Sequence, residues 1–424
     1  MRVLVTGASG AIASAVVPEL LAAGHTVIGL ARSDRSAQVV EALGAQVHRG
    51  DLADLDGLSA AARNADGVIH LAFDHTLQAA GDLAGAVEAD LRAIKAIGAA
   101  LEGTGKPFIG TNATGALAHA GFTGVLTEND TLPGGPRIDA ENVLIALASR
   151  SVRTAVIRLP PAVHHNGRYG FVSSLIDIAR ANGASGYVGN GRNRWPAVNT
   201  LDAARLYRLA LESAPPGSRL HAVAEEGVAL RDIAQAISGR VNVPSTEAAP
   251  EQFGFLAELI GLDNPVSSRA TRDALGWVPS HSGLIAGLRQ PTVLNVGLDP
   301  RVVGDPAAPS QAFPKVDAAM VRAGLDRAKT ELAGMGLGFE TCLLDRNEGT
   351  EKLFRDTVSR KHYDVILIGA GVRLDPSMTP LFEKLIGIAR THAPESALCF
   401  NTSPNSIVEA VQRVLPNRAF PHPS

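Results

Sequence analysis

The chain has 424 residues, of which 46% are hydrophobic and 19% charged, and its formal net charge is −3. This length favours two or three domains, and the near-neutral charge without a basic run argues against a nucleic-acid-binding protein. Two cysteines are too few for a disulfide framework, no apolar stretch is long enough for a membrane span, and Arg2 leads straight into an apolar run rather than a signal peptide. We therefore expect a cytoplasmic protein without a membrane partner.

The first predicted element is a strand, loop and helix at the N-terminus. Val3 to Val5 is short, apolar and β-branched, and Gly7 and Gly10 separate it from a helical pattern over 11–23. Glycines let a backbone approach a diphosphate closely, and the amino end of the next helix attracts its negative charge. A glycine-rich turn in an ordinary α/β protein is the alternative. The residues expected to contact a dinucleotide here are Thr6, Gly7, Ser9, Gly10, Ala11 and Ile12.

Strand and helix patterns alternate over the first 160 residues, which predicts a doubly wound, Rossmann-type parallel sheet. Further strands are expected at 25–31, 46–48, 67–72, 107–111 and 154–159. Helices are expected at 136–150 and, interrupted by glycines, at 76–103. Ligands of such sheets bind at the carboxyl ends of the strands.

The pattern is less regular from 167 to 289, which favours a small substrate-covering subdomain. Helices are expected at 171–181, 202–213, 230–238 and 250–262, with a strand at 220–223.

The composition changes at Gln290-Pro291, and a new alternation of four strands and four helices begins after it. The expected domains are therefore a dinucleotide-binding domain over 1–290 and a second, smaller α/β domain of unknown function over 291–424.

Several motifs, taken in order, resemble the extended short-chain dehydrogenase/reductase family, which includes nucleoside-sugar epimerases and dehydratases. They are Val5 to Ile12, Gly50-Asp51-Leu52, His70-Leu71-Ala72, Arg158 to Pro161 and Trp195 to Ala204. The resemblance covers about residues 1–290. It implies that Asp51 and Leu52 hold the adenine, that Ala72 lies by the nicotinamide ribose, and that the segment from Pro161 to Val163 lines the nicotinamide. Leu71, beside Ala72, is a further expected cofactor contact.

The catalytic residues depart from that family, which uses a Tyr four residues before a Lys and a nearby Ser or Thr. No tyrosine here has a Lys at that spacing, and Arg137 and Glu141 occupy it instead. Arginine is always protonated, so it can donate hydrogen bonds but cannot serve as the general acid. A helix-surface ion pair is the alternative for these two residues. Thr111, Asn112 and Thr114 stand where the hydroxyl should be, either as substrate contacts or as ordinary turn residues.

Candidate substrate contacts lie beyond the sixth strand. His164 has the near-neutral pKa of an acid or base, although an exposed loop histidine is the simpler interpretation. Arg192, Arg194 and Trp195 form a cationic and aromatic cluster in a region that contacts substrate in the family, or an Arg–Trp packing contact. No Cys or carboxylate at a metal-ligand spacing accompanies the pair His164-His165, so we expect no bound metal.

The cofactor choice depends on the residues after the second strand. Enzymes that prefer NAD place a carboxylate there, whereas this chain has Arg32 and Ser33, which suit a 2′-phosphate. Asp34, two residues on, leaves NAD as the alternative. The sequence thus predicts an NADP-dependent oxidoreductase acting on a small carbonyl or alcohol substrate, with an inactive dinucleotide-binding sensor or scaffold as its rival and a homodimer as an open option.

Overall fold

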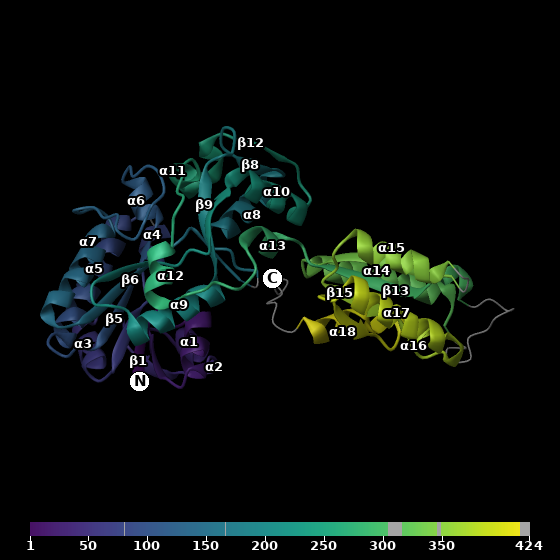
Figure 1. Ribbon diagram of the computed structural model, residues 1–424, viewed down its shortest axis with the longest axis horizontal. Helices are drawn as coiled ribbons and strands as arrows, with labels where there is room; N and C mark the ends of the chain where they lie inside the picture. The colour runs from purple at the N-terminus through teal and green to yellow at the C-terminus, as the bar shows by residue number, and fades with distance from the viewer. Residues whose placement is uncertain (80, 166, 304–315, 346–348, 416–424) are drawn as a thin grey trace. The chain divides into compact units, whose positions relative to one another are not determined.

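The computed structural model describes residues 1–79, 81–165, 167–303, 316–345 and 349–415. The chain divides into two compact units, Met1–Leu288 and Arg289–Ser424. Each unit is built on its own parallel sheet (Figure 1). The predicted α/β class, with a Rossmann-type sheet, a small substrate subdomain and a second α/β sheet, is confirmed.

The N-terminal unit contains a seven-stranded parallel sheet whose order reverses beside its first strand. In spatial order the strands are β10 (Ser218–His221), β6 (Arg153–Leu159), β5 (Pro107–Ala113), β4 (Gly67–His70), β1 (Arg2–Thr6), β2 (Thr26–Ala31) and β3 (Gln46–Arg49). The chain runs outward from β1 to β3 and then returns to the other side of β1 with β4. Ligands of open α/β sheets bind at such a switch point. Here the last residues of the two strands, Thr6 and His70, lie side by side in register.

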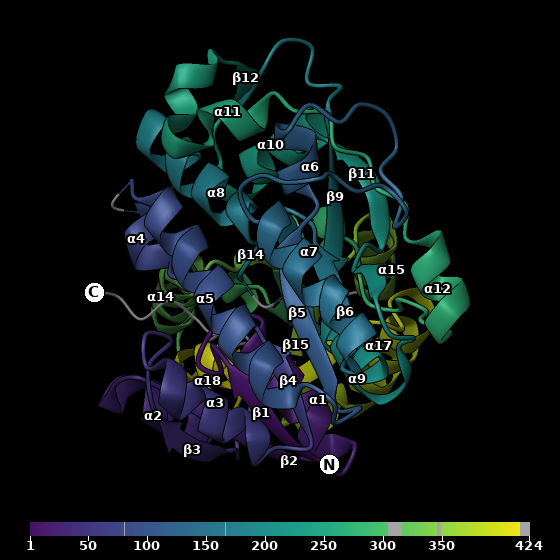
Figure 2. The same ribbon diagram turned by 90° about the vertical axis from the view of Figure 1, so that its left-hand side faces the viewer.

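Helices cover both faces of this sheet, because its central strands are apolar on both sides. One face packs against α1 (Ala13–Ala22), α2 (Asp34–Ala42) and α9 (Thr200–Ser213). The other packs against α3 (Leu55–Arg63), α5 (Leu83–Leu101) and α7 (Ile138–Ala146). Figures 1 and 2 show the second set together on one side of the sheet.

The subdomain is built on two small sheets with their own apolar core. One sheet has the order β11 (Glu225–Ala229), β9 (Arg194–Asn199) and β7 (Ala162–His164), and the other pairs β12 (Ser245–Glu247) with β8 (Ser185–Tyr187). Its helices are α8 (Phe171–Asn182), α10 (Leu230–Val241), α11 (Ala257–Ile260) and α13 (Leu284–Leu288), whereas α12 (Arg269–Leu275) packs against β10 of the main sheet and against α9. The predicted strand at 220–223 is β10, which lies in the main sheet.

Two long predicted helices are shorter in the structure. The first, over 76–103, is divided into α4 (His75–Ala79) and α5, because Gly81 has φ +85° and Asp82 caps α5 by accepting from the amide of Gly85 at 2.8 Å. The second, over 250–262, is a 3-10 turn (Pro250–Leu256) followed by α11, with a break at Gly254, whose φ is +55°. Turn and cap chemistry thus outweighs apolar periodicity at both places.

The C-terminal unit has a four-stranded parallel sheet in the order β14 (Gly338–Leu344), β13 (Thr292–Leu298), β15 (Val365–Ile368) and β16 (Ala397–Phe400). Its helices are α14 (Ala318–Gly334), α15 (Thr350–Arg360), α16 (Ala370–Arg373), α17 (Thr379–His392) and α18 (Ile407–Val414). Across the described ranges of both units, no helix is long and apolar enough to span a membrane.

Candidate functional site

The loop between β1 and α1 can be built only with glycine at its first turn. Gly7 has φ +66°, and a Cβ there would lie 2.8 Å from the backbone nitrogen of Ala72. The Gly10 amide closes the turn by donating to the Gly7 carbonyl at 2.9 Å. The loop after β4 therefore packs directly against the glycine loop, so both backbones are exposed to the same space at the switch point.

A cleft of about 420 Å³ opens at this position. Its lining includes ten of the predicted cofactor residues: Gly7, Ser9, Gly10, Ala11, Ile12, Arg32, Asp51, Leu52, Leu71 and Ala72. It also includes Phe73, which was not predicted. A cleft lined by a glycine loop, a helix amino end and a cationic side chain is suited to a phosphorylated dinucleotide.

Four of the predicted cofactor residues do not line the cleft. Thr6 is fully buried beneath it, where its hydroxyl contacts His70 Nδ1 at 2.7 Å and accepts from the Ala72 amide at 3.3 Å. Ser33 caps α2 by accepting from the amide of Ser36. Pro161 and Val163 lie at the junction of β6 and β7, with Pro161 buried. Thr6 and Ser33 therefore support backbone that borders the cleft.

Arg32 and its acidic neighbour Asp34 lie differently with respect to the cleft. Arg32 is exposed and lines the cleft. Asp34 does not line it, and its carboxylate accepts a hydrogen bond from Arg49 Nη2 at 2.6 Å. Of these two residues, the structure thus places the guanidinium, and not the carboxylate, at the cleft.

The threonine hydroxyls at the end of β5 are already hydrogen-bonded within the protein. Thr111 Oγ1 donates to the carbonyl of His70 at 2.8 Å and contacts the hydroxyl of Tyr207 at 2.8 Å. The carbonyl can only accept, so the single Thr111 proton is used there and Tyr207 donates to Thr111. Burial raises the pKa of Tyr207, which keeps that phenol protonated. Thr114 is fully buried and accepts from Asn264. The Thr111 proton is therefore committed within the protein, and the Thr114 hydroxyl is buried away from the surface.

Arg137 lies at the N-cap of α7 and points inward over the end of β5. Its Nη2 donates to the Thr111 carbonyl at 2.9 Å, and its guanidinium carbon lies 4.2 Å from the centroid of the Phe73 ring. Burial lowers its pKa, against the opposing effect of Asp90. Within the described residues, no acceptor is hydrogen-bonded to Nη1. Arg137 is therefore a half-buried cation whose Nη1 can still donate, and it lies next to a residue that lines the cleft.

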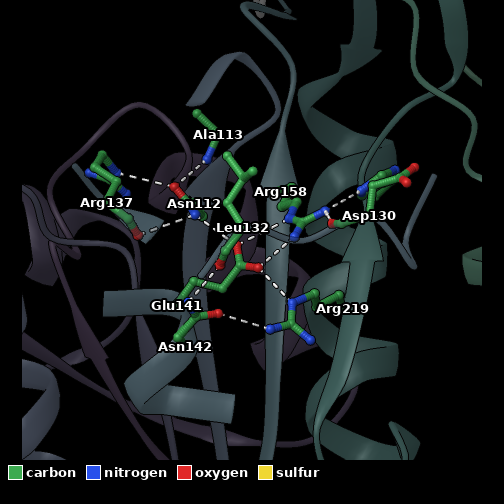
Figure 3. A network of polar contacts seen from close by, with 10 residues as sticks. Asn112, Ala113, Asp130, Leu132, Arg137, Glu141, Asn142, Arg158 and Arg219 are labelled. Atoms are coloured by element: carbon green, nitrogen blue, oxygen red, sulfur yellow. Dashed lines mark hydrogen bonds and ion pairs between the residues drawn. The ribbon is translucent and has the colours of Figure 1, made fainter. Parts of the chain in front are cut away.

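Glu141 is buried, with 3% of its surface exposed, in a network of donors that Figure 3 shows. Its carboxylate accepts from Arg158 Nη2 at 2.5 Å, from Arg219 Nε at 2.7 Å and from Asn112 Nδ2 at 2.7 Å. Burial by itself raises the pKa of Glu141, but these hydrogen bonds outweigh it and bring the pKa below its ordinary value. The surface pair that we considered for Arg137 and Glu141 is not formed, because Asn112 lies between them.

The predicted substrate residues do not form one cluster. His164 is buried at the end of β7, its Nε2 has no hydrogen-bond partner, and burial lowers its pKa to about 4. It is therefore not the exposed loop histidine of the simpler interpretation. Arg192 is exposed, whereas Arg194 makes a two-bond ion pair with Asp263 at 3.0 and 2.8 Å. Trp195 has 0% exposure and packs in the subdomain core, so the expectation that it contacts substrate is wrong.

Three residues that matter most to the network were not predicted as site residues: Phe73, Arg158 and Arg219. Arg158 was noted only as part of a family motif. A single arginine in the apolar run Thr154 to Leu159 is nonetheless a usable signal, because a charge in a central strand requires a buried partner. Among the described residues, no cluster of His, Cys, Asp and Glu side chains is arranged to hold a metal ion.

A glycine loop at the switch point of a parallel sheet defines the N-terminal unit as a Rossmann-type α/β domain. Residues 3–106 match the family described as NAD dependent epimerase/dehydratase. An uncharacterized protein of Schizosaccharomyces pombe is 44% identical over 292 residues, which is 68% of this chain and 98% of that protein. An uncharacterized protein of Saccharomyces cerevisiae is 41% identical over 304 residues, 70% of this chain and all of that protein.

Solved structures show the same fold at lower identity. A dTDP-glucose 4,6-dehydratase from Streptomyces venezuelae, with NAD bound, has a TM-score of 0.56 and 19% identity, covering 68% of this chain and 96% of its own. A UDP-glucuronic acid 4-epimerase from Bacillus cereus, with UDP-glucuronic acid and NAD, has a TM-score of 0.55 and 18% identity over the same shares. The N-terminal region of about 300 residues belongs to the NAD-dependent epimerase/dehydratase family, and the C-terminal region is assigned to none.

Proposed function

We propose that the N-terminal unit is an NADP-dependent oxidoreductase that interconverts a small carbonyl compound and its alcohol without a Tyr–Lys pair. The observation that carries this proposal is the position of Arg137. Its guanidinium is hydrogen-bonded at the carboxyl end of β5 and lies on Phe73, which lines the cleft.

The cleft residues fit a dinucleotide. The contact between Gly7 and Ala72 leaves no room for a side chain, so the diphosphate can approach the backbone of the glycine loop. Asp51 and Leu52 would hold the adenine, and Leu71 and Ala72 would border the nicotinamide ribose. A bound nicotinamide supplies or accepts the hydride. The NAD found in the two solved neighbours supports this class of cofactor.

The preference for NADP follows from the charges at the adenosine end. The Arg32 guanidinium presents paired donors that match the geometry of a phosphate. The Asp34 carboxylate, which would otherwise accept from a ribose hydroxyl, is bonded to Arg49 and does not line the cleft. A 2′-phosphate bound beside Arg32 would therefore gain a cation, while the Asp34 carboxylate is turned to Arg49.

Arg137 donates to the substrate oxygen in this proposal. When a hydride adds to a carbonyl carbon, negative charge develops on the oxygen, and a fixed cation stabilises that charge more than it stabilises the neutral carbonyl. The oxygen then takes its proton from water, because arginine does not release one. Thr111 has its proton committed, and Glu141 is held as a carboxylate.

The test combines turnover with cofactor binding, using the full chain. NADPH oxidation is followed with a panel of aldehydes, ketones and diketones, and NADPH binding is titrated by fluorescence. We expect Arg137→Ala to lower kcat/KM on the order of 100-fold, as for the loss of one oxyanion donor. NADPH affinity should remain unchanged. Arg137→Lys, which keeps the charge, should lose less, and the exposed Arg92→Ala on α5 serves as the matched control. Equal turnover by wild type and Arg137→Ala would contradict the role of Arg137.

A dinucleotide-binding sensor is the second candidate. It is favoured by one observation, that the Thr111 proton and the Glu141 carboxylate are committed within the protein while the Thr114 hydroxyl is buried. Tight NADPH binding without oxidation of NADPH by any member of the panel would support it.

A further inference from the structure

Arg137 has an unusual backbone conformation. Its φ is +62° and its ψ is −19°, and it is one of three non-glycine residues with positive φ in the described part of the chain. A bulky residue keeps this conformation only where surrounding contacts hold it, and such residues concentrate at functional sites. One of these contacts is from Asn112, whose Nδ2 donates to the Arg137 carbonyl at 3.4 Å.

Asn112 also contacts the side chain of Arg137. Its Oδ1 accepts from Arg137 Nε at 3.3 Å and from the amide of Ala113 at 2.8 Å. At its other end, Nδ2 donates to Glu141 Oε2 at 2.7 Å. Asn112 therefore contacts the arginine at two points, the backbone carbonyl and the guanidinium, while its own amide is bonded at both ends.

The chemistry of these partners permits one orientation of the Asn112 amide. A carboxylate can only accept, so the amide nitrogen must face Glu141. A guanidinium and a backbone amide can only donate, so the amide oxygen must face Arg137 and Ala113. Rotation of the amide by half a turn would set donor against donor and acceptor against acceptor. Glu141 therefore fixes the orientation of the Asn112 amide, and the amide in turn fixes the position of the Arg137 guanidinium.

Glu141 is itself held in place from the opposite side. Arg158 Nε lies 3.1 Å from Oε2, and Arg219 Nε lies 2.7 Å from Oε1. Arg158 is fully buried on β6, and its Nη1 donates to the carbonyl of Asp130 at 3.0 Å. Figure 3 shows the resulting chain of contacts, which runs from Arg219 and Arg158 through Glu141 and Asn112 to Arg137.

We propose that Asn112 is a positioning residue that orients the Arg137 guanidinium toward the substrate oxygen, with Glu141 fixing the Asn112 amide. This inference rests on the proposed function for the role of Arg137, but the geometry itself can be measured without turnover. Nε and Nη2 are used to anchor the arginine, which leaves Nη1 for the substrate.

The first experiment measures the anchoring directly. The full chain is labelled with ¹⁵Nε-arginine, and the Arg137 signal is assigned by its loss in Arg137→Lys. We expect Arg137 Nε–H to exchange with solvent at least about tenfold more slowly than that of the exposed Arg32, because it is hydrogen-bonded and half-buried. Exchange as fast as that of Arg32 in the wild type would overturn the proposal without any variant.

Three variants separate positioning from stability. Asn112→Ala removes both contacts and should speed exchange of the Arg137 signal. Asn112→Asp keeps an acceptor for Arg137 but sets a carboxylate against Glu141, so it should lower Tm and still retain slow exchange. Asn142→Ala is the matched control, because Asn142 bonds Arg219 at 3.1 Å and does not contact Asn112 or Arg137 through its side chain. Exchange that tracks Tm across the three variants, rather than the acceptor at position 112, would overturn the proposal.

The kinetic readout distinguishes this proposal from the proposed function. Where the wild type turns over, Asn112→Ala should lower kcat about tenfold and leave the KM for NADPH unchanged, because the cofactor contacts lie elsewhere. An unchanged kcat in Asn112→Ala would overturn the positioning role. A wild type without turnover would defeat the proposed function alone, and the exchange experiment would still decide whether Asn112 orients Arg137.

Discussion

Arg32 lines the end of the cleft at which we propose that the adenosine of the cofactor binds. Because it is exposed, water and salt screen its interaction with a phosphate, and a bidentate hydrogen-bonded contact is needed to give a measurable preference. The neighbouring ion pair of Asp34 and Arg49 is exposed as well, with side-chain exposures of 90% and 54%. This ion pair therefore adds little to the stability of the fold, and its effect is to turn the Asp34 carboxylate toward Arg49.

We expect Arg32→Ala to weaken NADPH binding by about 10-fold and to leave NADH binding unchanged, which corresponds to roughly 1.4 kcal/mol for the lost charge-assisted contact. Isothermal titration of the purified full chain with each dinucleotide measures both affinities. Arg35→Ala is the matched control, since Arg35 is exposed nearby but does not line the cleft. Tighter binding of NADH than NADPH by the unmodified chain would contradict the assignment.

The positions of Gly7, Gly10 and Arg32 could be predicted because the fingerprint ties each of them to a local turn or strand end. Trp195 could not. Its exposure depends on which face of β9 meets the subdomain core, and no neighbouring residue in the sequence determines that. The network around Glu141 brings together residues from β5, α7, β6 and β10, so the spacing of Arg137 and Glu141 alone gave no indication of Asn112 between them.

Strands β7 and β10 of the N-terminal unit, like β4, end in buried histidines. His164 Nε2 has no hydrogen-bond partner and lies 3.9 Å from the Glu225 carboxylate. Burial lowers the pKa of His164 to about 4, with His165 adding to the effect and Asp202 opposing it. Burial likewise lowers the pKa of His221 to about 4, and Arg158 adds to this against the opposing effects of Ser267 and Glu128. Both imidazoles are therefore neutral in the folded protein at neutral pH.

These histidines predict a loss of stability in mild acid. In the unfolded chain each imidazole binds a proton as the pH falls below about 6.5, while the folded one does so only near pH 4. The stability that each contributes is thus complete at pH 7 and is lost between pH 6.5 and 4, on the order of 1–3 kcal/mol per histidine. Urea unfolding at several pH values should show a shallower pH dependence for His164→Leu than for wild type. A pH dependence of stability that is unchanged in His164→Leu would contradict this assignment. So would an equally shallow dependence in the control His119→Gln, which replaces an exposed histidine.

At the scale of elements, apolar runs identified the buried parallel strands well, because strands covered on both faces are nearly continuous in hydrophobicity. The three-residue strands β7, β8 and β12 lack the length for such a signal. An interruption of the helix by glycines was expected over 76–103, but the exact break between α4 and α5 was not placed, for a different reason. Alanine-rich periodicity continues across Gly81 and Asp82, and only the left-handed glycine and the aspartate cap end one helix and begin the next.

The two units of the whole molecule have separate sheets and separate cores. The strands β13 to β16 pair only with one another in the described residues, in the order that begins with β14. The two apolar clusters on the faces of this sheet consist of residues from 293 onward, among them Val293, Leu332 and Tyr363. Secondary-structure pairing and apolar burial within residues 291–424 are thus satisfied locally, which is the property of a domain that folds alone.

We therefore predict that residues 291–424, expressed without the preceding region, show a cooperative thermal transition. A fragment of this size buries enough apolar surface in two clusters to offset the entropy of folding, since domains of about 100–150 residues commonly fold alone. Calorimetry of the fragment, beside the full chain, tests this prediction. The substitution Leu367→Ala, in the buried strand β15, should lower the fragment's stability by about 2–5 kcal/mol. The exposed Leu353→Ala on α15 should have little effect. A fragment that melts without cooperativity, or that responds alike to both substitutions, would show that its core depends on residues before 291.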